Sequence, residues 1–379
     1  MNTICNEQIT KNKGEWSEAY VLLKLLLDGQ IFEQNQDGTK STSYMKVLSV
    51  IKIMKSGNCF EFKREKDFVE CILNGKKYKT IFYEEFLTAV QNTYDEIKNG
   101  KGRSFSAPKT EEFFINKLEL VNFKSDSNDK NDIYLKIENP KDGSVYIDGF
   151  SVKSLIGKSP SLFNCSNASN LVYRIKDCTE QEMNDFNEKA KTDFKPAIIK
   201  FICDNRLNFL NSKFMDSKNS KYGDLKIPGY YFAWNVDLLD IRILDVFSEM
   251  VKIFYGTTGN SKLLDMLNIL QRNNPLGVKF PDTFYEMKIR QFLFASFCGL
   301  TASEKWTGKQ KVNGGYIEVQ KDGGVLYQKA ISDEKFTDYL IETTRMDGPS
   351  KDKYDYGKIY FSDEYNCYCI NLNFQVRFR

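Results

Sequence analysis

The chain contains no histidine among its 379 residues, and this absence removes several classes of enzyme chemistry. Nucleophilic triads of the Ser-His-Asp or Cys-His kind need imidazole as their base. The zinc sites of metalloproteases and deaminases need histidine ligands, and nucleases with a histidine general base are excluded on the same ground. A reaction centre in this chain must therefore use carboxylates, Lys, Tyr, Ser, Cys or a hard metal ion held by oxygen ligands.

Long apolar runs and paired cysteines are also missing. The start of the chain has no apolar signal-peptide core, and the most hydrophobic stretch, 21–27, is interrupted by Lys24, so no segment is expected to span a membrane. The nine cysteines form no CxxC pair, which is typical of reduced thiols in a cytoplasmic protein. Since the net charge is only +3, any surface that binds nucleic acid is expected to be local.

Hydrophobic periodicity predicts an α/β (α+β) protein. We divide the chain into 1–120, an N-terminal helix with a β-rich subdomain, 121–235, a strand meander with a long polar loop, and 236–379, a helical and then β-rich part. Helices are predicted over 12–28, 83–98, 110–120, 179–191, 196–211, 236–255, 261–271, 283–300 and 332–342.

Two strands of the meander have the residues with the clearest chemical meaning. Asp132 begins the segment DIYLKIEN, and Ser151 and Lys153 share one face of VYIDGFSVKS. Because the connecting turn is short, we expect Asp132 and Lys153 to converge at one end of a sheet. An Asp on one strand and a Lys on the next is the skeleton of the PD-(D/E)xK nucleases. In these enzymes carboxylates hold a divalent cation, usually Mg²⁺, and the Lys assists the attacking water.

Ser151 stands two residues before Lys153, where the common pattern has Asp or Glu, so a second carboxylate has to come from elsewhere. The segment GEWSE in the first predicted helix offers Glu15 and Glu18, three residues apart on roughly one face. We favour Glu18, because Gly14 four residues earlier allows close approach of the helix to neighbouring backbone; Glu15 is the alternative. Taken alone, these glutamates are equally well explained as favourable charges at a helix N-terminus.

Several blocks of the sequence resemble the HpaII family of type II restriction endonucleases. These blocks occur in the family order and cover nearly the whole chain, and GEWSE and GFSVKS are the most distinctive of them. The resemblance implies a PD-(D/E)xK-like mixed-sheet core with an N-terminal β-rich insertion and large helical and C-terminal β-rich additions. The blocks are NKGEWSEAYVLLKLLLDG, NDIYLKI, GFSVKSLIGKSPSLFNCSNASNLVYRI, NPLGVKFPDTFYEMKI, GGYIEV and INLNFQVRF.

The resemblance also implies an activity, which is Mg²⁺-dependent cleavage of double-stranded DNA at a short palindrome, CCGG for the namesake of the family, with 5′-phosphate ends. Asp132 and Glu18 are then the expected metal ligands, Lys153 assists the water, and Ser151 is a family trait. A palindromic site suits a homodimer, although a monomer that nicks each strand in turn is an alternative. The restriction role implies a cognate DNA methyltransferase as functional partner.

DNA contacts are expected in two polar segments. The Ser/Asn-rich loop 154–170 follows Lys153 and offers hydroxyl, amide and ammonium groups to phosphates and base edges. The basic turn at 305–315 offers lysines and glycines, and we expect the surrounding part, 236–379, to take part in DNA recognition. A plain surface loop and a plain hairpin turn are the alternatives. The candidate residues are Lys158, Ser159, Asn164, Asn167, Lys309 and Lys311.

Two other functions remain open at this point. A repair or junction nuclease would share the catalytic core but would cut according to DNA structure. A catalytically silent DNA-binding protein would have Asp132 and Lys153 as ordinary surface residues. Discrete bands from a long DNA substrate separate restriction from repair, and a plasmid left uncut in Mg²⁺ excludes both enzymes.

Overall fold

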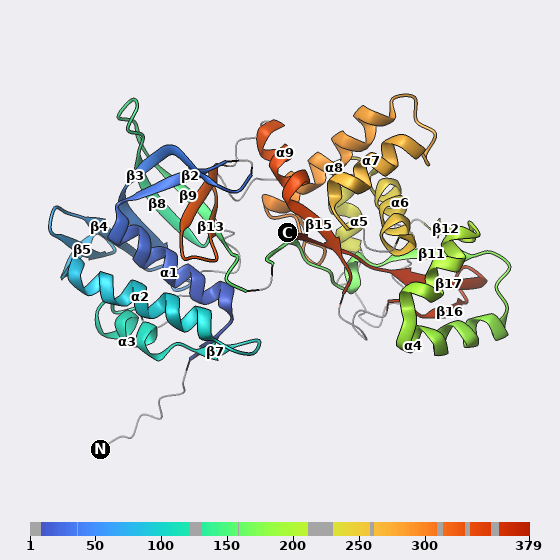
Figure 1. The fold of residues 1–379 in the computed structure, drawn as a ribbon, viewed down its shortest axis with the longest axis horizontal. Coiled ribbons are helices and arrows are strands. Elements are labelled where there is room, and N and C mark those ends of the chain that lie inside the picture. Colours follow the sequence, from blue (N-terminus) through green and yellow to red (C-terminus); the bar gives the residue numbers. More distant parts are fainter. Residues whose placement is uncertain are drawn as a thin grey trace, which may run out of the picture. The chain divides into compact units, whose positions relative to one another are not determined.

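A computed structural model describes residues 9–35, 37–120, 131–157, 159–210, 230–257, 261–308, 314–329, 334–349 and 356–379. In these ranges the chain is α+β, as predicted, and forms two compact units (Figure 1). Unit 1 comprises Met1–Pro160 and Lys311–Ser332, and unit 2 comprises Ser161–Gln310 and Asp333–Arg379. This division differs from the three successive segments expected from the sequence, because a late hairpin returns to the N-terminal unit.

Unit 1 contains the helices α1 (Lys13–Asp28), α2 (Tyr83–Asn99) and α3 (Pro108–Asn116). Its strands are β1 (Thr10–Lys11), β2 (Gln30–Gln34), β3 (Lys40–Ile53), β4 (Cys59–Arg64), β5 (Phe68–Leu73), β6 (Lys76–Phe82), β7 (Phe105–Ser106), β8 (Ile133–Glu138), β9 (Val145–Ser154), β13 (Gly315–Val319) and β14 (Val325–Lys329).

The large sheet of unit 1 has nine strands in the order β2-β14-β13-β9-β8-β3-β4-β5-β6, and β2 also pairs with β3. Strands β3, β8 and β9 are antiparallel neighbours, and β13 then lies parallel to β9. Helix α1 packs against β3, β9 and β13 (Figure 1). Strand β3 and the two strands predicted within 132–154 are therefore neighbours in the centre of one sheet.

Helix α1 and strands β3, β8 and β9 share one apolar core. The alternation predicted for DIYLKIEN is confirmed, because Ile133, Leu135 and Ile137 are buried in this core together with Trp16 and Leu23 of α1. Full burial of an aliphatic side chain contributes about 1.5–3 kcal/mol. The helix ends at Gly29, whose positive φ of 68° suits glycine. Apolar packing therefore fixes α1 across the strands that contain the candidate site.

Unit 2 contains α4 (Glu180–Cys203), α5 (Tyr230–Asp237), α6 (Ile243–Gly256), α7 (Leu263–Asn273), α8 (Pro281–Phe297) and α9 (Glu334–Thr343). Its two sheets have the orders β12-β11-β17-β16 and β10-β18-β15, and a short 3₁₀ helix, η1 (Asn167–Ser169), precedes β11. The strands are β10 (Ser161–Phe163), β11 (Leu171–Ile175), β12 (Leu207–Leu210), β15 (Thr344–Asp347), β16 (Ile359–Ser362), β17 (Cys367–Leu372) and β18 (Gln375–Phe378).

Aromatic rings dominate the core of unit 2. Phe163, Phe232, Phe247, Phe292 and Phe374 come from three helices, a strand and a loop, and the closest ring centroids, those of Phe247 and Phe292, are 4.4 Å apart. Such aromatic pairs add about 0.5–1.5 kcal/mol beyond their area burial.

Two of the helices predicted in unit 2 have the wrong bounds. The helix expected over 196–211 is the second half of α4, which is kinked at Asp193, and Leu207–Leu210 instead form β12. That strand pairs with β11, so a contact with a distant segment overrides the local preference. The helix expected over 236–255 is divided into α5 and α6.

Two expectations from the composition can be compared with the described part of the chain. None of its helices combines the length and the apolar character needed to cross a bilayer. Its eight described cysteines are all free thiols.

Candidate active site

The predicted strand pair brings Asp132 directly against the GFSVKS segment. The main-chain N–H of Asp132 donates to Phe150 O at 2.8 Å. Its side-chain Oδ2 accepts hydrogen bonds from Val152 N at 2.7 Å and from Ser151 Oγ at 3.2 Å. Hydrogen bonds to a carboxylate are strong because the acceptor is charged. Ser151, at the position of the missing carboxylate, therefore orients Asp132.

Lys153 lies on the same face of β9 as Ser151. Phe150 and Val152 face the core shared with α1, so the alternation of the strand places Ser151 and Lys153 on the opposite face. Lys153 is partly buried. In this register Asp132 directly precedes the pair Ile133–Phe150, close to the end of β9 that contains Lys153. That the side chains of Asp132 and Lys153 meet stays a prediction.

Helix α1 supplies Glu18 to the same end of the sheet. Glu18 Oε2 lies 3.3 Å from Lys52 Nζ, and the same ammonium donates to Asp132 O at 2.6 Å. Burial raises the pKa of the Glu18 carboxyl to about 7; the negative charge of Asp132 acts in the same direction, and Lys52 opposes it. Glu18 and Asp132 are thus two carboxylates that repel each other across a partly dehydrated space.

Glu15 has a different task. Its Oε2 accepts from Asn12 N at 2.9 Å, and Asn12 Oδ1 accepts from Glu15 N at 3.0 Å, which is a complete capping box. The geometry thus brings Glu18, and not Glu15, beside Lys52 and Asp132, and the role of Glu18 as a metal ligand stays a prediction. The reason given for Glu18 from the sequence is wrong. No neighbouring backbone lies close to Gly14, since a Cβ there would meet only Asn12 Oδ1, at 3.1 Å.

The first residues after Lys153 are fixed to α1. Ser17 Oγ donates to Ser154 Oγ at 2.8 Å, and Lys13 Nζ donates to Ile156 O at 3.4 Å. The helix that supplies Glu18 therefore also holds the strand end that supplies Lys153.

Sequence reasoning missed two buried ionisable residues near these groups. Lys52 of β3 is 3% exposed and Glu318 of β13 is 4% exposed. Glu318 pairs in register with Lys153, and its Oε1 accepts from Gln34 Nε2 at 2.7 Å and Gln320 Nε2 at 2.5 Å. Burial raises the pKa of the Glu318 carboxyl above its usual range. The block GGYIEV contained Glu318, but nothing in its local pattern indicated a buried charge.

Three of the six candidate DNA-binding residues lie in the described part of the chain, and they belong to two different units. Lys158, Lys309 and Lys311 lie outside the described residues. Ser159 is partly buried and belongs to unit 1, whereas Asn164, which is exposed, and Asn167, which begins η1, belong to unit 2. Their role in DNA binding stays a prediction.

The donor set of the site suits a hard divalent cation. Within the described ranges, no group of three or more His, Cys, Asp or Glu side chains is arranged to hold a metal. Mg²⁺, however, commonly uses one or two protein carboxylates and completes its octahedron with water and substrate phosphate oxygens. A bound divalent cation would offset the repulsion between the negative charges of Glu18 and Asp132, so these residues fit Mg²⁺.

Comparison with known proteins identifies the class and then the family. Over 376 residues, which are 98% of this chain and 99% of the relative, the chain is 29% identical to the type II restriction enzyme HpaII of Haemophilus parainfluenzae. The sequence model of the family described as HpaII restriction endonuclease matches residues 12–378. The chain therefore belongs to the HpaII family of restriction endonucleases, which confirms the resemblance seen in its sequence. No solved structure matches it.

Proposed function

We propose that this chain hydrolyses both strands of double-stranded DNA at a short palindrome, similar to CCGG, through a Mg²⁺-dependent site of the PD-(D/E)xK type. The observation that carries the proposal is the placement of Glu18 and Asp132 at the end of the sheet where Lys153 emerges, in a chain of this family. The arrangement of α1 on a sheet in which β3, β8 and β9 are antiparallel and β13 is parallel to β9 supports a nuclease core of this type.

Each side chain has a defined task in this proposal. Asp132, oriented by Ser151 and by the N–H of Val152, binds the cation together with Glu18. When bound, Mg²⁺ supplies Lewis-acid charge at the phosphate and lowers the pKa of a bound water. Lys153 orients the attacking water and neutralises the charge that develops on the phosphate oxygens. In-line attack leaves 5′-phosphate and 3′-hydroxyl ends.

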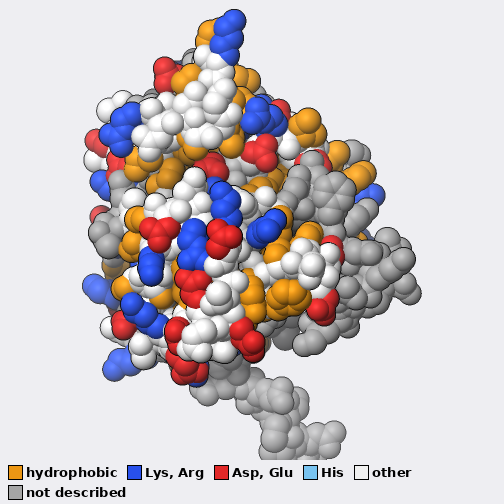
Figure 2. All heavy atoms as spheres, turned by 90° about the vertical axis from the view of Figure 1, so that its right-hand side faces the viewer, with side chains coloured by type: hydrophobic (Ala, Val, Ile, Leu, Met, Phe, Trp, Pro, Cys, Tyr) orange, Lys and Arg blue, Asp and Glu red, His pale blue; other side chains and the backbone are white. Residues whose placement is uncertain are grey.

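Recognition in this proposal depends on local polar groups. Figure 2 shows Lys and Arg side chains interspersed with Asp and Glu on the face it draws, without a continuous basic surface there. The loop residues Ser159, Asn164 and Asn167, with Lys158, Lys309 and Lys311, are the proposed DNA contacts. A palindromic site suits a homodimer, and a cognate methyltransferase in the same cytoplasm would protect the host DNA.

The first experiment incubates pure protein with long DNA and Mg²⁺ and sequences the ends of the products. Discrete fragments with one end sequence are expected, and the same data give the recognition site and the stagger. Nicking that depends on DNA structure would instead indicate a repair or junction nuclease. DNA left uncut across a series of pH values and divalent metals would contradict both nuclease functions.

The second experiment tests the site. Asp132→Ala and Lys153→Ala are each expected to lower the cleavage rate at least about 10³-fold, while DNA binding measured in Ca²⁺ is largely retained. Asp142→Ala, in the exposed turn between β8 and β9, is the matched control and should cut at the wild-type rate. Full activity of either site variant would contradict the assignment.

A further inference from the structure

Lys52 is a buried lysine at the candidate site, and neither its strand nor its local sequence requires a charge there. Its side chain is 4% exposed, whereas that of Lys46 on the same strand is 49% exposed. Burying an ammonium group is costly unless it is paired and hydrogen-bonded. The position of Lys52 in the core side of β3 therefore needs an explanation.

The partners of Lys52 supply that explanation. Its Nζ lies 3.3 Å from Glu18 Oε2 on α1 and 2.6 Å from Asp132 O before β8. The nearest paired residues of β3 and β8 are Ile51 and Tyr134, so the ammonium group extends past the last pair to the main chain at Asp132. One side chain thus joins the helix and the strand end from which the two carboxylates come.

We propose that Lys52 is a positioning residue of this site, whose ammonium group holds the Glu18 carboxylate and the main chain at Asp132 in the arrangement that binds the divalent cation. The proposal rests on the proposed function, since it takes Glu18 and Asp132 as the metal ligands. Partners that orient metal ligands typically contribute 10–100-fold to metal affinity. The positive charge of Lys52 also repels a cation, so the sign of the effect distinguishes positioning from competition.

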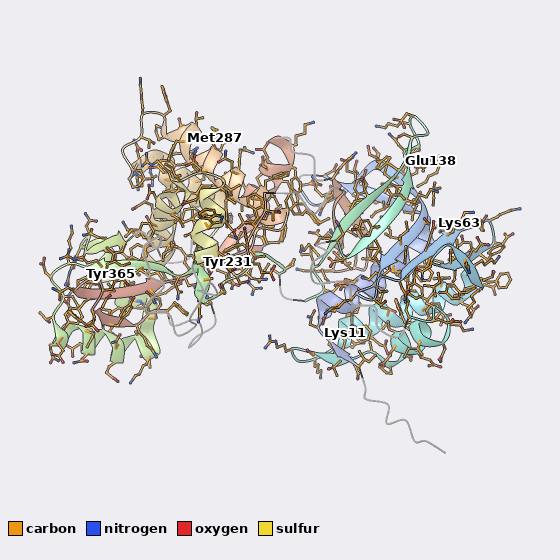
Figure 3. The ribbon with its side chains drawn as sticks, turned by 180° about the vertical axis from the view of Figure 1, so that it is seen from behind. Lys11, Lys63, Glu138, Tyr231, Met287 and Tyr365 are labelled. Atoms are coloured by element: carbon orange, nitrogen blue, oxygen red, sulfur yellow. The ribbon has the colours of Figure 1, made fainter. Side chains whose placement is uncertain are left out.

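A second ion pair between the same two strands provides a matched control. Lys46 Nζ of β3 lies 2.6 Å from Glu138 Oε1 of β8, with both side chains partly exposed. Figure 3 labels Glu138 near the tip of the β8–β9 hairpin. Removal of Lys46 therefore changes a contact between the same two strands without touching Glu18 or Asp132. Because an exposed pair contributes only about 0–1 kcal/mol, little loss of stability is expected.

The test measures metal binding directly and not only cleavage. Titration calorimetry with Mn²⁺ in the absence of DNA, and the Mg²⁺ concentration that gives half-maximal cleavage, are compared for the wild type, Lys52→Met, Lys52→Arg and Lys46→Met. We expect about 10–100-fold weaker metal binding for Lys52→Met, a smaller loss for Lys52→Arg, which keeps the charge and the donors on a longer side chain, and wild-type binding for Lys46→Met. Circular dichroism checks that each variant is folded.

A double variant shows whether Lys52 acts through Glu18. Lys52→Met should add less to the loss of metal affinity in a Glu18→Gln background than it does alone, since residues that act as a unit are not additive. Full additivity would overturn the proposal, as would wild-type or tighter metal binding by Lys52→Met. If Lys52→Met does not fold, Lys52→Gln takes its place, and wild-type or tighter metal binding by Lys52→Gln overturns the proposal.

The proposed function and this inference fail in different ways. A wild-type protein that binds Mn²⁺ but cuts no DNA overturns the nuclease function and leaves the comparison of metal affinities intact. A wild-type protein that cuts DNA, with unchanged metal affinity in Lys52→Met, overturns only the role of Lys52. A wild-type protein that binds no divalent metal overturns both.

Discussion

The two units bury different kinds of polar side chain. Among the described residues, the buried Lys, Arg, Asp and Glu side chains are those of Lys11, Lys52 and Glu318, all of unit 1, whereas the buried Ser, Thr, Asn and Gln residues of unit 2 are neutral. A typical neutral group in unit 2 is Asn373, which donates to Ser166 O at 2.7 Å. Two of these three residues of unit 1, Lys52 on β3 and Glu318 on β13, lie beside the candidate site.

This difference indicates that folding does not by itself require buried ions, whereas the chemistry of a site can require them. Neutral amides and hydroxyls lose little on burial when they are hydrogen-bonded, whereas a buried ion carries a desolvation penalty of several kcal/mol that its partners have to offset. In its described residues, unit 2 forms an aromatic core without such ions. The burial of Lys52 and Glu318 in unit 1 is therefore best explained by the site that these residues adjoin.

The largest effect is expected from placing a charge inside unit 2, which tests whether this unit tolerates a buried ion. Asn373→Asp removes two donors and sets a carboxylate beside Ser166 O and Asn170 Oδ1, which already accept from this amide. We expect a loss of about 3–5 kcal/mol in the free energy of unfolding at pH 7, measured by urea denaturation. The loss should shrink at acid pH, where the new carboxyl group is protonated.

Asn268→Asp, at an exposed position within α7 of the same unit, is the control for that experiment and should stay within about 0.5 kcal/mol of the wild type. Equal stability of the two variants would mean that unit 2 tolerates buried charge as well as unit 1 does, and the contrast between the units would disappear.

A smaller effect is expected from removing the charge of Glu18. The folded-state pKa of about 7 lies above the usual 4.5, so the folded metal-free protein binds more protons than the unfolded chain between these values. The stabilising contribution of Glu18 is therefore complete below pH 4.5 and is lost as the pH rises through 7. Relative to Glu18→Gln, the wild type should lose about 1–3 kcal/mol of unfolding free energy between pH 4.5 and 8. Parallel curves would contradict this environment for Glu18.

The smallest effect concerns Glu15, three residues earlier on α1. Glu15→Ala breaks the capping box with Asn12 and should cost about 0.5–1 kcal/mol of stability, measured by thermal denaturation. Glu15→Gln keeps the box and should be nearly neutral, and both variants should keep the wild-type cleavage rate and Mg²⁺ dependence. A cleavage defect in Glu15→Gln as large as that in Glu18→Gln would move the metal site toward the end of the helix.

The sequence predicts the parts of the site that depend on short-range patterns. Alternation with a period of two places Ser151 and Lys153 on one face, and a short turn makes β8 and β9 neighbours, so the position of Asp132 follows. Lys52 and Glu318 are missed because their burial results from pairings of β3 with β8 and of β13 with β9. These segments are separated in sequence by more than 70 residues, and a lone strand lysine or glutamate usually faces solvent.

The discontinuity of unit 1 has a consequence for how the enzyme is made. Strand β13 is synthesised after residues 161–310, yet it is the parallel neighbour of β9. At a ribosomal rate of about 5–20 residues per second, β9 and Lys153 therefore wait roughly 10–30 s for this neighbour. During that interval the nascent chain lacks Glu318 and the strand that completes the sheet around Lys153. For a protein whose proposed activity threatens the DNA of the cell that makes it, the chain order delays completion of the active site until most of the molecule has left the ribosome.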